Sequence, residues 1–479
     1  MSKVLVTDAI APEGLDLLRS GAEVDVKRGL METELIDIIK DYEALVVRSE
    51  TKVTSAVIQA GGQLKVIARA GIGVDNIDLE AATVAGIPVV NAPIGNTVAA
   101  AEHTMALMLS LARNVPQAYA SMKNGEWKRS AYMGVEVRGK VLGVVGLGRV
   151  GTEVAIRARA FGMGVVAYDP FVSPDYASRL GAQVVSLDEL LEGSDFITLH
   201  TPLTPNTNKL IGSRELSLMK PDARLINVAR GELIDEVALL EALQADKLGG
   251  AALDVFTEEP PDDMTLAQHS RVISTPHLGA STEEAQREVA IEAAGQVLAI
   301  LDGQSASNMV NAPVVRPEVQ AILSPYLPVA SLLGKLLTHL SYEQFVGVTI
   351  RYQGEIADHD TAILKAAVLE GVLTPVISEH VNLINAPFLA QRRGLSITEE
   401  KSSEATEYAS LITVTLNTTK EGVSLAGTAL RDGPRIVKFN DYWMDVEPST
   451  PYLLFVDNQD QPGSVGAVCT VAGQHNINI

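Results

Sequence analysis

The sequence is short of cysteine and of basic residues, and both shortages exclude classes of function. Its single cysteine, Cys469, can form no internal disulfide and no thiolate metal cluster, which is typical of a protein from a reducing compartment. Lysine and arginine number 38 against 59 aspartates and glutamates, a formal net charge of −21. Such a charge repels nucleic acid and anionic membranes, so we expect neither as a partner, and we expect no metal site. Small anionic substrates are still possible, because a few basic side chains at a site can outweigh the field of distant acidic residues.

Long apolar runs are lacking as well. The longest candidate, residues 98–111, is interrupted by Glu102 and His103. The first residues read as a β-strand and not as a basic segment followed by an apolar core. We therefore expect a cytoplasmic protein without a membrane span. Its 479 residues, 47% of them hydrophobic, suggest about three domains.

Two regions of the chain alternate between β-branched runs and amphipathic stretches. In the first, up to about residue 95, residues 44–47 and 66–68 are expected strands. In the second, from residue 140, residues 141–145 and 196–199 are the clearest strands. This alternation predicts two α/β lobes built on parallel sheets. Between them, Thr97–Arg113 reads as one long helix that links the lobes and, being largely apolar, is expected to be covered in a dimer.

The character of the sequence changes after residue 302. Residues 302–317 are rich in glycine, serine, asparagine and proline, which indicates a boundary. Beyond it, residues 346–352 and 411–416 alternate like strands, and glycine-containing turns favour an antiparallel sheet. A second boundary at 448–451 leaves residues 452–479, too few for a domain.

A glycine-rich motif points to a dinucleotide. The sequence GLGRVG at 146–151 follows a predicted strand and opens a predicted helix, and Asp169 ends the next strand. The first glycine permits a tight turn, the second lets a pyrophosphate approach the helix N-terminus, and the third allows close packing. Asp169 would bind the ribose hydroxyls and repel a 2′-phosphate, so NAD is expected rather than NADP. The alternative is a glycine turn that only packs a β-α unit.

Three further strand ends carry candidate catalytic side chains: Arg230, Glu259 and His277. Hydride transfer from an alcohol needs a proton acceptor, and histidine suits that role near neutral pH. A carboxylate beside it would fix its tautomer and stabilise its cation, and an arginine fork would hold a substrate carboxylate. Taken singly, each residue could instead be a surface cation, a solvated loop residue or a core histidine.

Together, GLGRVG, NVARG, DVFTEEP and TPHLGAST resemble the D-isomer-specific 2-hydroxyacid dehydrogenases, and within that family the long-form phosphoglycerate dehydrogenases. The resemblance implies NAD-dependent oxidation of D-3-phosphoglycerate to 3-phosphohydroxypyruvate, the first step of serine biosynthesis. It makes Arg230, Glu259 and His277 the catalytic residues and puts Asp254 against the nicotinamide carboxamide. The implied NAD contacts are Gly146, Gly148, Arg149, Val150, Gly151, Asp169, Thr201, Val228, Ala229, Arg230, Asp254, His277, Leu278, Gly279 and Ala280.

Two alternatives stay open beside that function. One is another 2-hydroxyacid dehydrogenase, such as a hydroxypyruvate or glyoxylate reductase, although the long tail argues against it. The other is a dinucleotide-sensing corepressor or scaffold on the same fold.

The resemblance extends to the substrate site and the tail. VVRSETKVT and RAGIGVDN are similar to family stretches that bind substrate, although the family often has a small hydroxyl residue where Ile72 stands. The implied substrate contacts are Arg48, Ser49, Gly71, Ile72, Gly73 and Asn96, and Arg129 could reach a substrate phosphate from a neighbouring subunit. We expect a homodimer or homotetramer.

The expected fold is a Rossmann NAD-binding lobe (96–284) inserted in a flavodoxin-like substrate lobe (1–95 and 285–310). An α+β intervening domain (317–447) and a partial ACT domain (452–479) follow. The ACT segment would supply one strand, one helix and the start of a second strand. Because most of their partner strands are missing, we expect it to bury too little apolar surface to hold a single fold, so that residues after about 451 are mobile or packed in a non-native way. Serine is the effector implied for the family, and we expect no serine response from this incomplete module.

Overall fold

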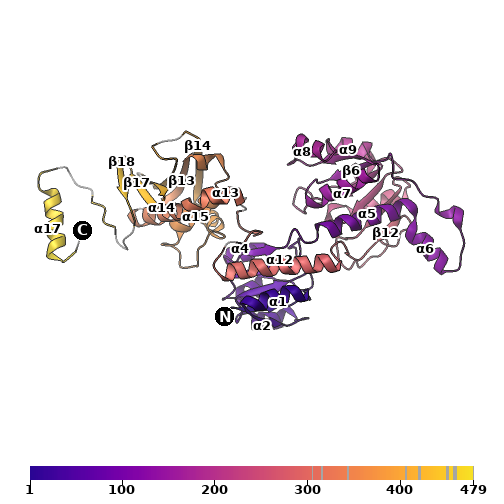
Figure 1. The fold of residues 1–479 in the computed structure, drawn as a ribbon, viewed down its shortest axis with the longest axis horizontal. Helices are drawn as coiled ribbons and strands as arrows, with labels where there is room; N and C mark the ends of the chain where they lie inside the picture. The colour runs from indigo at the N-terminus through magenta and orange to yellow at the C-terminus, as the bar shows by residue number, and fades with distance from the viewer. Residues whose placement is uncertain are drawn as a thin grey trace. The chain divides into compact units, whose positions relative to one another are not determined.

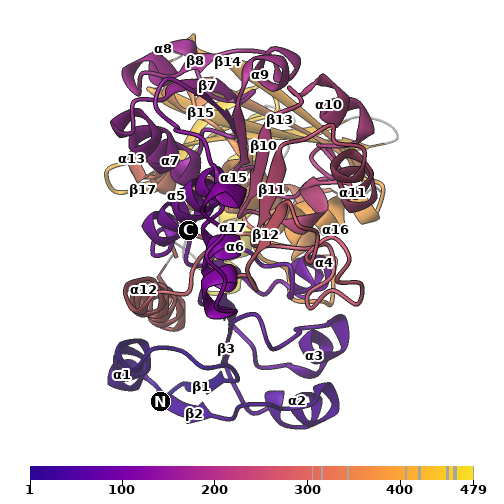
Figure 2. The same cartoon turned by 90° about the vertical axis from the view of Figure 1, so that its right-hand side faces the viewer.

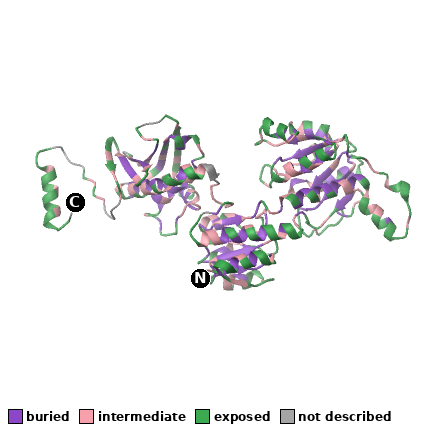
Figure 3. Cartoon of the chain, viewed as in Figure 1, coloured by how far each residue is buried: buried purple, intermediate pink, exposed green. Residues whose placement is uncertain are grey.

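The computed structural model describes residues 1–304, 306–313, 317–341, 345–404, 407–418, 422–448, 453–456 and 461–477. The chain divides into two compact units. Unit 1 comprises Met1–Ala82 and Ile87–Asn311, and unit 2 comprises Thr83–Gly86 and Ala312–Ile479. Each unit has its own buried core (Figure 3).

The first sheet of unit 1 has five parallel strands in the order β2-β1-β3-β4-β5. Helices cover both faces (Figure 2): α1 (Pro12–Gly21) and α12 (Glu283–Leu301) pack on one, α2 (Glu32–Ile39) and α3 (Ser55–Ala60) on the other. The order reverses between β1 and β3, and ligands of open α/β sheets bind at such a point. The strands are β1 (Lys3–Val6), β2 (Glu23–Val26), β3 (Ala44–Val47), β4 (Val66–Arg69) and β5 (Val89–Asn91), and α4 (Leu79–Val84) precedes β5.

The second sheet of unit 1 has seven parallel strands in the order β12-β11-β10-β9-β6-β7-β8, which confirms the predicted Rossmann arrangement. Its reversal lies between β6 and β9. The strands are β6 (Val141–Val145), β7 (Gly164–Tyr168), β8 (Gln183–Val184), β9 (Phe196–Leu199), β10 (Arg224–Asn227), β11 (Gly250–Leu253) and β12 (Val272–Ser274). The helices are α5 (Thr97–Arg113), α6 (Val115–Lys123), α7 (Arg149–Ala160), α8 (Pro174–Arg179), α9 (Leu187–Gly193), α10 (Ser213–Leu218) and α11 (Glu236–Gln244).

The long helix α5 packs within its own chain, beside α7 and against the seven-stranded sheet (Figure 1). Met105, Met108 and Leu111 are buried in the core that these elements share. The expected cover of α5 by a second subunit stays a prediction. A helix with buried small and apolar residues along most of its length is accounted for by this packing within one chain.

Unit 2 is built on a six-stranded sheet in the order β14-β13-β15-β16-β17-β18. The antiparallel expectation holds for four of its pairs, but β14 runs parallel to β13. Helices α14 (Leu327–Leu340), α15 (Ala362–Leu373) and α16 (Ala386–Arg392) share the core of this unit with the sheet. The strands are β13 (Phe345–Gly354), β14 (Ser396–Ser402), β15 (Ser410–Thr418), β16 (Val423–Leu430), β17 (Gly433–Phe439) and β18 (Tyr442–Val446).

One described stretch, Val319–Leu340, is long and apolar enough to cross a membrane by length and composition. It is a longer candidate than the residues 98–111 chosen from the sequence. Within it, Leu333 and Leu337 are fully buried in the core of unit 2. Packing in a protein core accounts for this apolar composition.

The described part of the tail has the helix of the implied ACT pattern and none of its strands. The helix is present as α17 (Ser464–Gln474), with none of its residues buried. The described residues 453–456 form no strand, and Asn476 lies in a turn where a second strand was expected to begin. A strand needs a hydrogen-bonded neighbour, and none pairs with these described residues.

Candidate active site

The glycine-rich loop after β6 has the geometry that a dinucleotide requires. Gly146 has a φ of +93°, and a Cβ there would lie 2.8 Å from the backbone of His200. Gly148 caps α7 and has open space where its Cβ would be. A Cβ on Gly151 would lie 2.0 Å from the Gly146 carbonyl oxygen. The three glycines therefore turn the chain, leave room for a pyrophosphate and let the helix approach the strand.

Asp169 and Thr201 border this loop. The Asp169 carboxylate accepts hydrogen bonds from the backbone N–H groups of Leu147 and Phe171, both at 2.9 Å, so it also holds the loop in place. The hydroxyl oxygen of Thr201 is buried and has no hydrogen-bond partner among the described residues. A buried polar atom of this kind calls for a partner, and a bound dinucleotide at the β6/β9 reversal would provide one. The residues present thus fit NAD.

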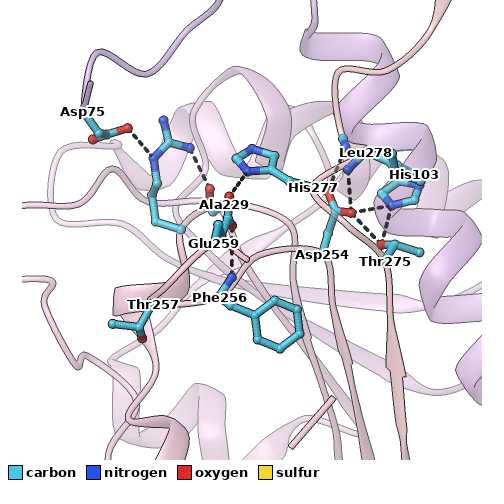
Figure 4. A network of polar contacts seen from close by, with 12 residues as sticks. Asp75, His103, Ala229, Asp254, Phe256, Thr257, Glu259, Thr275, His277 and Leu278 are labelled. Atoms are coloured by element: carbon cyan, nitrogen blue, oxygen red, sulfur yellow. Dashed lines mark hydrogen bonds and ion pairs between the residues drawn. The ribbon is translucent and has the colours of Figure 1, made fainter. Parts of the chain in front are cut away.

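His277 and Glu259 form the pair expected from the sequence. His277 Nδ1 lies 2.6 Å from Glu259 Oε2, and Glu259 Oε1 accepts from the backbone N–H of Phe256 at 3.1 Å (Figure 4). Burial raises the pKa of the Glu259 carboxyl, but the hydrogen bond and charge of His277 and the Phe256 N–H outweigh it, so the pKa lies below its usual value. An ionised Glu259 fixes the proton of His277 on Nδ1 and leaves Nε2 as an acceptor.

The loop that carries His277 is held by Asp254, at the end of β11. The Asp254 side chain is fully buried and accepts hydrogen bonds of 2.8 Å from the backbone N–H groups of Leu278 and Gly279. The backbone N–H of His277, whose φ is +54°, donates to the Asp254 carbonyl oxygen. Asp254 therefore holds the conformation of the loop that carries His277. The contact of Asp254 with a nicotinamide carboxamide stays a prediction.

Arg230 joins the two sheets of unit 1. Its Nε donates to Asp75 Oδ2 at 3.0 Å, and its Nη1 donates to the carbonyl oxygen of Ala229 at 2.7 Å (Figure 4). The guanidinium also lies against the turn that contains Gly73, where a Cβ would be 1.7 Å from Arg230 Nη2. A side chain at position 73 would therefore displace the end of Arg230 from this place.

A second arginine lies over the same turn. Arg69 ends β4, and a Cβ on Gly71 would be 2.6 Å from its Nη1. Burial lowers the pKa of Arg69 to about 10, and the positive charges of Arg230 and Arg48 contribute while Asp75 opposes them. Arg69 and Arg230 thus lie over one turn, and the charge of Arg48 acts on Arg69, an arrangement that an anionic ligand would stabilise.

The other predicted substrate residues differ in how far the structure involves them. Arg48 Nε and Asn96 Oδ1 are buried and have no hydrogen-bond partner within the described part of the chain. Ser49 is exposed, and the carbonyl oxygen of Ile72 accepts from Asn91 Nδ2 at 2.5 Å. Arg129 is exposed in η1 (Arg129–Tyr132) and lines an open hollow with Trp127 and Met133, and no contact in unit 1 joins it to the arginines above.

Sequence reasoning missed several residues that build this site. Arg69 and Asp75 stand inside the quoted RAGIGVDN stretch but were given no role. Asp8, after β1, accepts from the backbone N–H groups of Arg48 and Thr51 at 2.5 and 3.2 Å and so fixes the Arg48 turn. His103 bonds Asp254 from the middle of α5. Position at the end of a parallel strand was the available signal for Asp8 and Arg69, whereas no local signal marks His103.

Comparison with known proteins agrees with this geometry. The family described as "D-isomer specific 2-hydroxyacid dehydrogenase, NAD binding domain" matches residues 105–279, and the "D-3-phosphoglycerate dehydrogenase intervening domain" matches residues 322–440. The solved D-lactate dehydrogenase of Aquifex aeolicus, complexed with NAD and lactic acid, is 31% identical with a TM-score of 0.60. The similarity covers 65% of this chain and 99% of that one.

Two curated relatives match along the whole chain. The D-3-phosphoglycerate dehydrogenase of Synechocystis sp. is 46% identical over 100% of this chain and 87% of its own length. That of Methanocaldococcus jannaschii is 45% identical over 100% of this chain and 91% of its own length. Identity of this extent covers both the NAD-binding lobe and unit 2, so the chain belongs to the D-3-phosphoglycerate dehydrogenases and uses NAD.

Proposed function

We propose that this chain oxidises D-3-phosphoglycerate at C2 with NAD, giving 3-phosphohydroxypyruvate, the first step of serine biosynthesis. Its membership in the D-3-phosphoglycerate dehydrogenases supports this assignment. NAD, when bound, takes the hydride from C2 together with its two electrons. The protein then has to orient the substrate and accept one proton from the C2 hydroxyl.

His277 is the proton acceptor in this proposal. Its Nε2 takes the hydroxyl proton as the C2–H bond breaks, and the ionised Glu259 at 2.6 Å stabilises the resulting imidazolium. Arg230 holds the substrate carboxylate with its guanidinium and so directs C2 toward the cofactor. Its bond to Asp75 keeps that guanidinium over the Gly73 turn.

The position of Arg69 and Arg230 over one turn, with the charge of Arg48 acting on Arg69, is the observation that carries the substrate assignment. D-3-Phosphoglycerate bears a carboxylate and a phosphate, and phosphate is the group that clustered arginines bind best. We assign the carboxylate to Arg230 and the phosphate to Arg48 and Arg69, with Ser49, Asn96 and the 71–73 turn as hydrogen-bonding partners. A lactate-like substrate has no group for Arg48 and Arg69 to bind.

The test is a substrate panel followed through NADH absorbance. D-3-Phosphoglycerate should be oxidised with the highest kcat/KM. The kcat/KM values for D-glycerate and D-lactate should be at least about tenfold lower, because each of these substrates lacks the phosphate contacts. NADP should replace NAD poorly, and Asp169→Ala should narrow that preference. Equal use of D-glycerate and D-3-phosphoglycerate would favour a hydroxypyruvate or glyoxylate reductase. Absence of turnover on the entire panel would favour a binding protein.

The proposal also covers localisation, oligomeric state and domain limits. We propose cytoplasmic localisation and a homodimer or homotetramer, in which Arg129 of one subunit reaches the phosphate bound by its neighbour. We keep the domain limits given above, with residues 285–310 returning to the substrate lobe, a placement supported by the packing of α12 on α1. Serine is the proposed effector of the family's ACT domain.

A further inference from the structure

A second histidine lies behind the active-site loop, on a helix that carries none of the assigned catalytic groups. His103 is in the middle of α5, and its Nε2 is 3.1 Å from both Asp254 Oδ1 and Thr275 Oγ1 (Figure 4). Its side chain is 20% exposed and that of Asp254 0%. The three side chains are bonded to one another, because Thr275 Oγ1 also donates to Asp254 Oδ1 at 2.5 Å.

From this geometry we infer that His103 is a positioning residue for the reaction. Its Nε2–H is a donor to the Asp254 carboxylate, which in turn holds the Leu278 and Gly279 backbone N–H groups and thereby the backbone next to His277. The inference rests on the proposed function for its effect on turnover. It gives α5 a role in catalysis without any contact between α5 and the substrate.

The packing of α5 against the loop explains why the contact depends on this helix. Ala100 and His103 are three residues apart and so lie on one face of α5. Ala100 presents only a methyl group, and the Cβ position of Gly279 is 4.0 Å from it. A small residue at 100 thus lets the helix come close enough for the imidazole to reach Asp254.

Electrostatics makes His103 more than a packing contact. A buried carboxylate needs several donors to stay ionised. Burial raises the pKa of Asp254, but the hydrogen bonds from His103, Thr275 and the Leu278 N–H outweigh it, and the pKa lies below its usual value. Removing the His103 donor weakens the anion that shapes the loop. The alternative is a histidine that only fills space between helix and sheet.

The experiment compares three variants of the full chain. His103→Leu keeps bulk and loses the donor, His103→Gln keeps an amide N–H where Nε2 stands, and Glu102→Gln changes the exposed neighbour that pairs with Arg157. We expect kcat to fall on the order of 10- to 100-fold in His103→Leu, because a small displacement of the acceptor slows the reaction strongly. The KM for NAD should change less than threefold. His103→Gln should recover most of kcat, and Glu102→Gln should match the parent.

A readout independent of turnover separates this inference from the substrate assignment. Hydrogen exchange of the backbone amides of Leu278 and Gly279 should speed up at least tenfold in His103→Leu and return toward the parent rate in His103→Gln. If the parent oxidises no D-3-phosphoglycerate, the proposed function fails and the exchange rates still test His103. The inference is overturned if kcat and exchange in His103→Leu match the parent. The inference is also overturned if His103→Leu and His103→Gln lose kcat equally and their Tm falls to the same extent. The role of His103 as a packing residue would then explain both losses.

Discussion

The two proposed ligand-binding edges of unit 1 have the same topology and different chemistry. At the β6 edge of the seven-stranded sheet, we propose recognition by the backbone of Gly146, Gly148 and the N-terminus of α7. At the carboxyl edge of the five-stranded sheet, we propose recognition by the side chains of Arg48 and Arg69. The glycines form a contiguous motif that can be recognised in the sequence. The arginines come from separate strands and form a site only after folding brings them together. A motif therefore predicts the first edge, and only the arrangement of charges in three dimensions predicts the second.

A change in the proposed catalytic pair, His277 and Glu259, should cause the largest loss of activity. His277→Ala removes the proton acceptor, and we expect kcat to fall on the order of 10²–10⁴-fold. Initial rates at saturating NAD and substrate measure it. His475→Ala, exposed at the end of α17, is the matched control. If kcat of His277→Ala stays within a few-fold of the parent value, His277 is not the proton acceptor.

Arginine-to-lysine changes test the edge that binds through side chains. Arg69→Lys should lower kcat/KM for D-3-phosphoglycerate about 10- to 100-fold and leave that for D-glycerate nearly unchanged, because a lysine cannot form the fork that holds phosphate. Arg230→Lys should lower both, since both substrates have the carboxylate. The exposed Arg214, changed to lysine, serves as control. Identical losses in the two variants on both substrates would contradict the division of roles.

Two glycines test the edge that binds through backbone. Gly148→Ala meets open space, so Tm should hold while the KM for NAD rises about fivefold from the loss of about 1 kcal/mol at the helix N-terminus. Gly146→Ala should instead destabilise the fold by about 1–3 kcal/mol, because an alanine at φ +93° is strained and touches His200. Thermal unfolding and NAD titration distinguish the two. A lower Tm in Gly148→Ala would show that the space is not free.

The last test concerns the pH dependence of stability beside the NAD-binding loop. Burial lowers the pKa of His200, after β9, to about 4. As pH falls from neutrality the unfolded chain takes up this proton first, so the stability is complete above about pH 6.5 and up to about 3 kcal/mol is lost by pH 4. His200→Gln, which can keep the bond to Thr198, should flatten the fall of Tm between pH 7 and 5. Parallel curves for parent and variant would contradict it.

The strands and helices of unit 1 could be predicted from the sequence because each parallel β-α unit has a local sequence pattern. The strands Ala44–Val47, Val141–Val145 and Phe196–Leu199 lie where β-branched runs predicted them, and α5 and α12 have the predicted ends. The pairing of β14 with β13 was not predicted, since paired residues such as Gly347 and Ser396 lie 49 positions apart and leave no local pattern. The described tail forms no strand for a related reason, because a strand depends on its partner.

The sequence by itself determined the chemistry that lies in contiguous motifs: the glycine turn, Asp169, and the Arg230, Glu259 and His277 set. The tertiary structure decided which groups complete them. It brought Arg69 within electrostatic range of Arg48 and Arg230, paired Asp75 with the Arg230 guanidinium, and hydrogen-bonded His103 to Asp254. These interactions join residues 21 to 161 positions apart. Their energy depends on burial and on distances of about 3 Å, which only the packing of helices on sheets fixes.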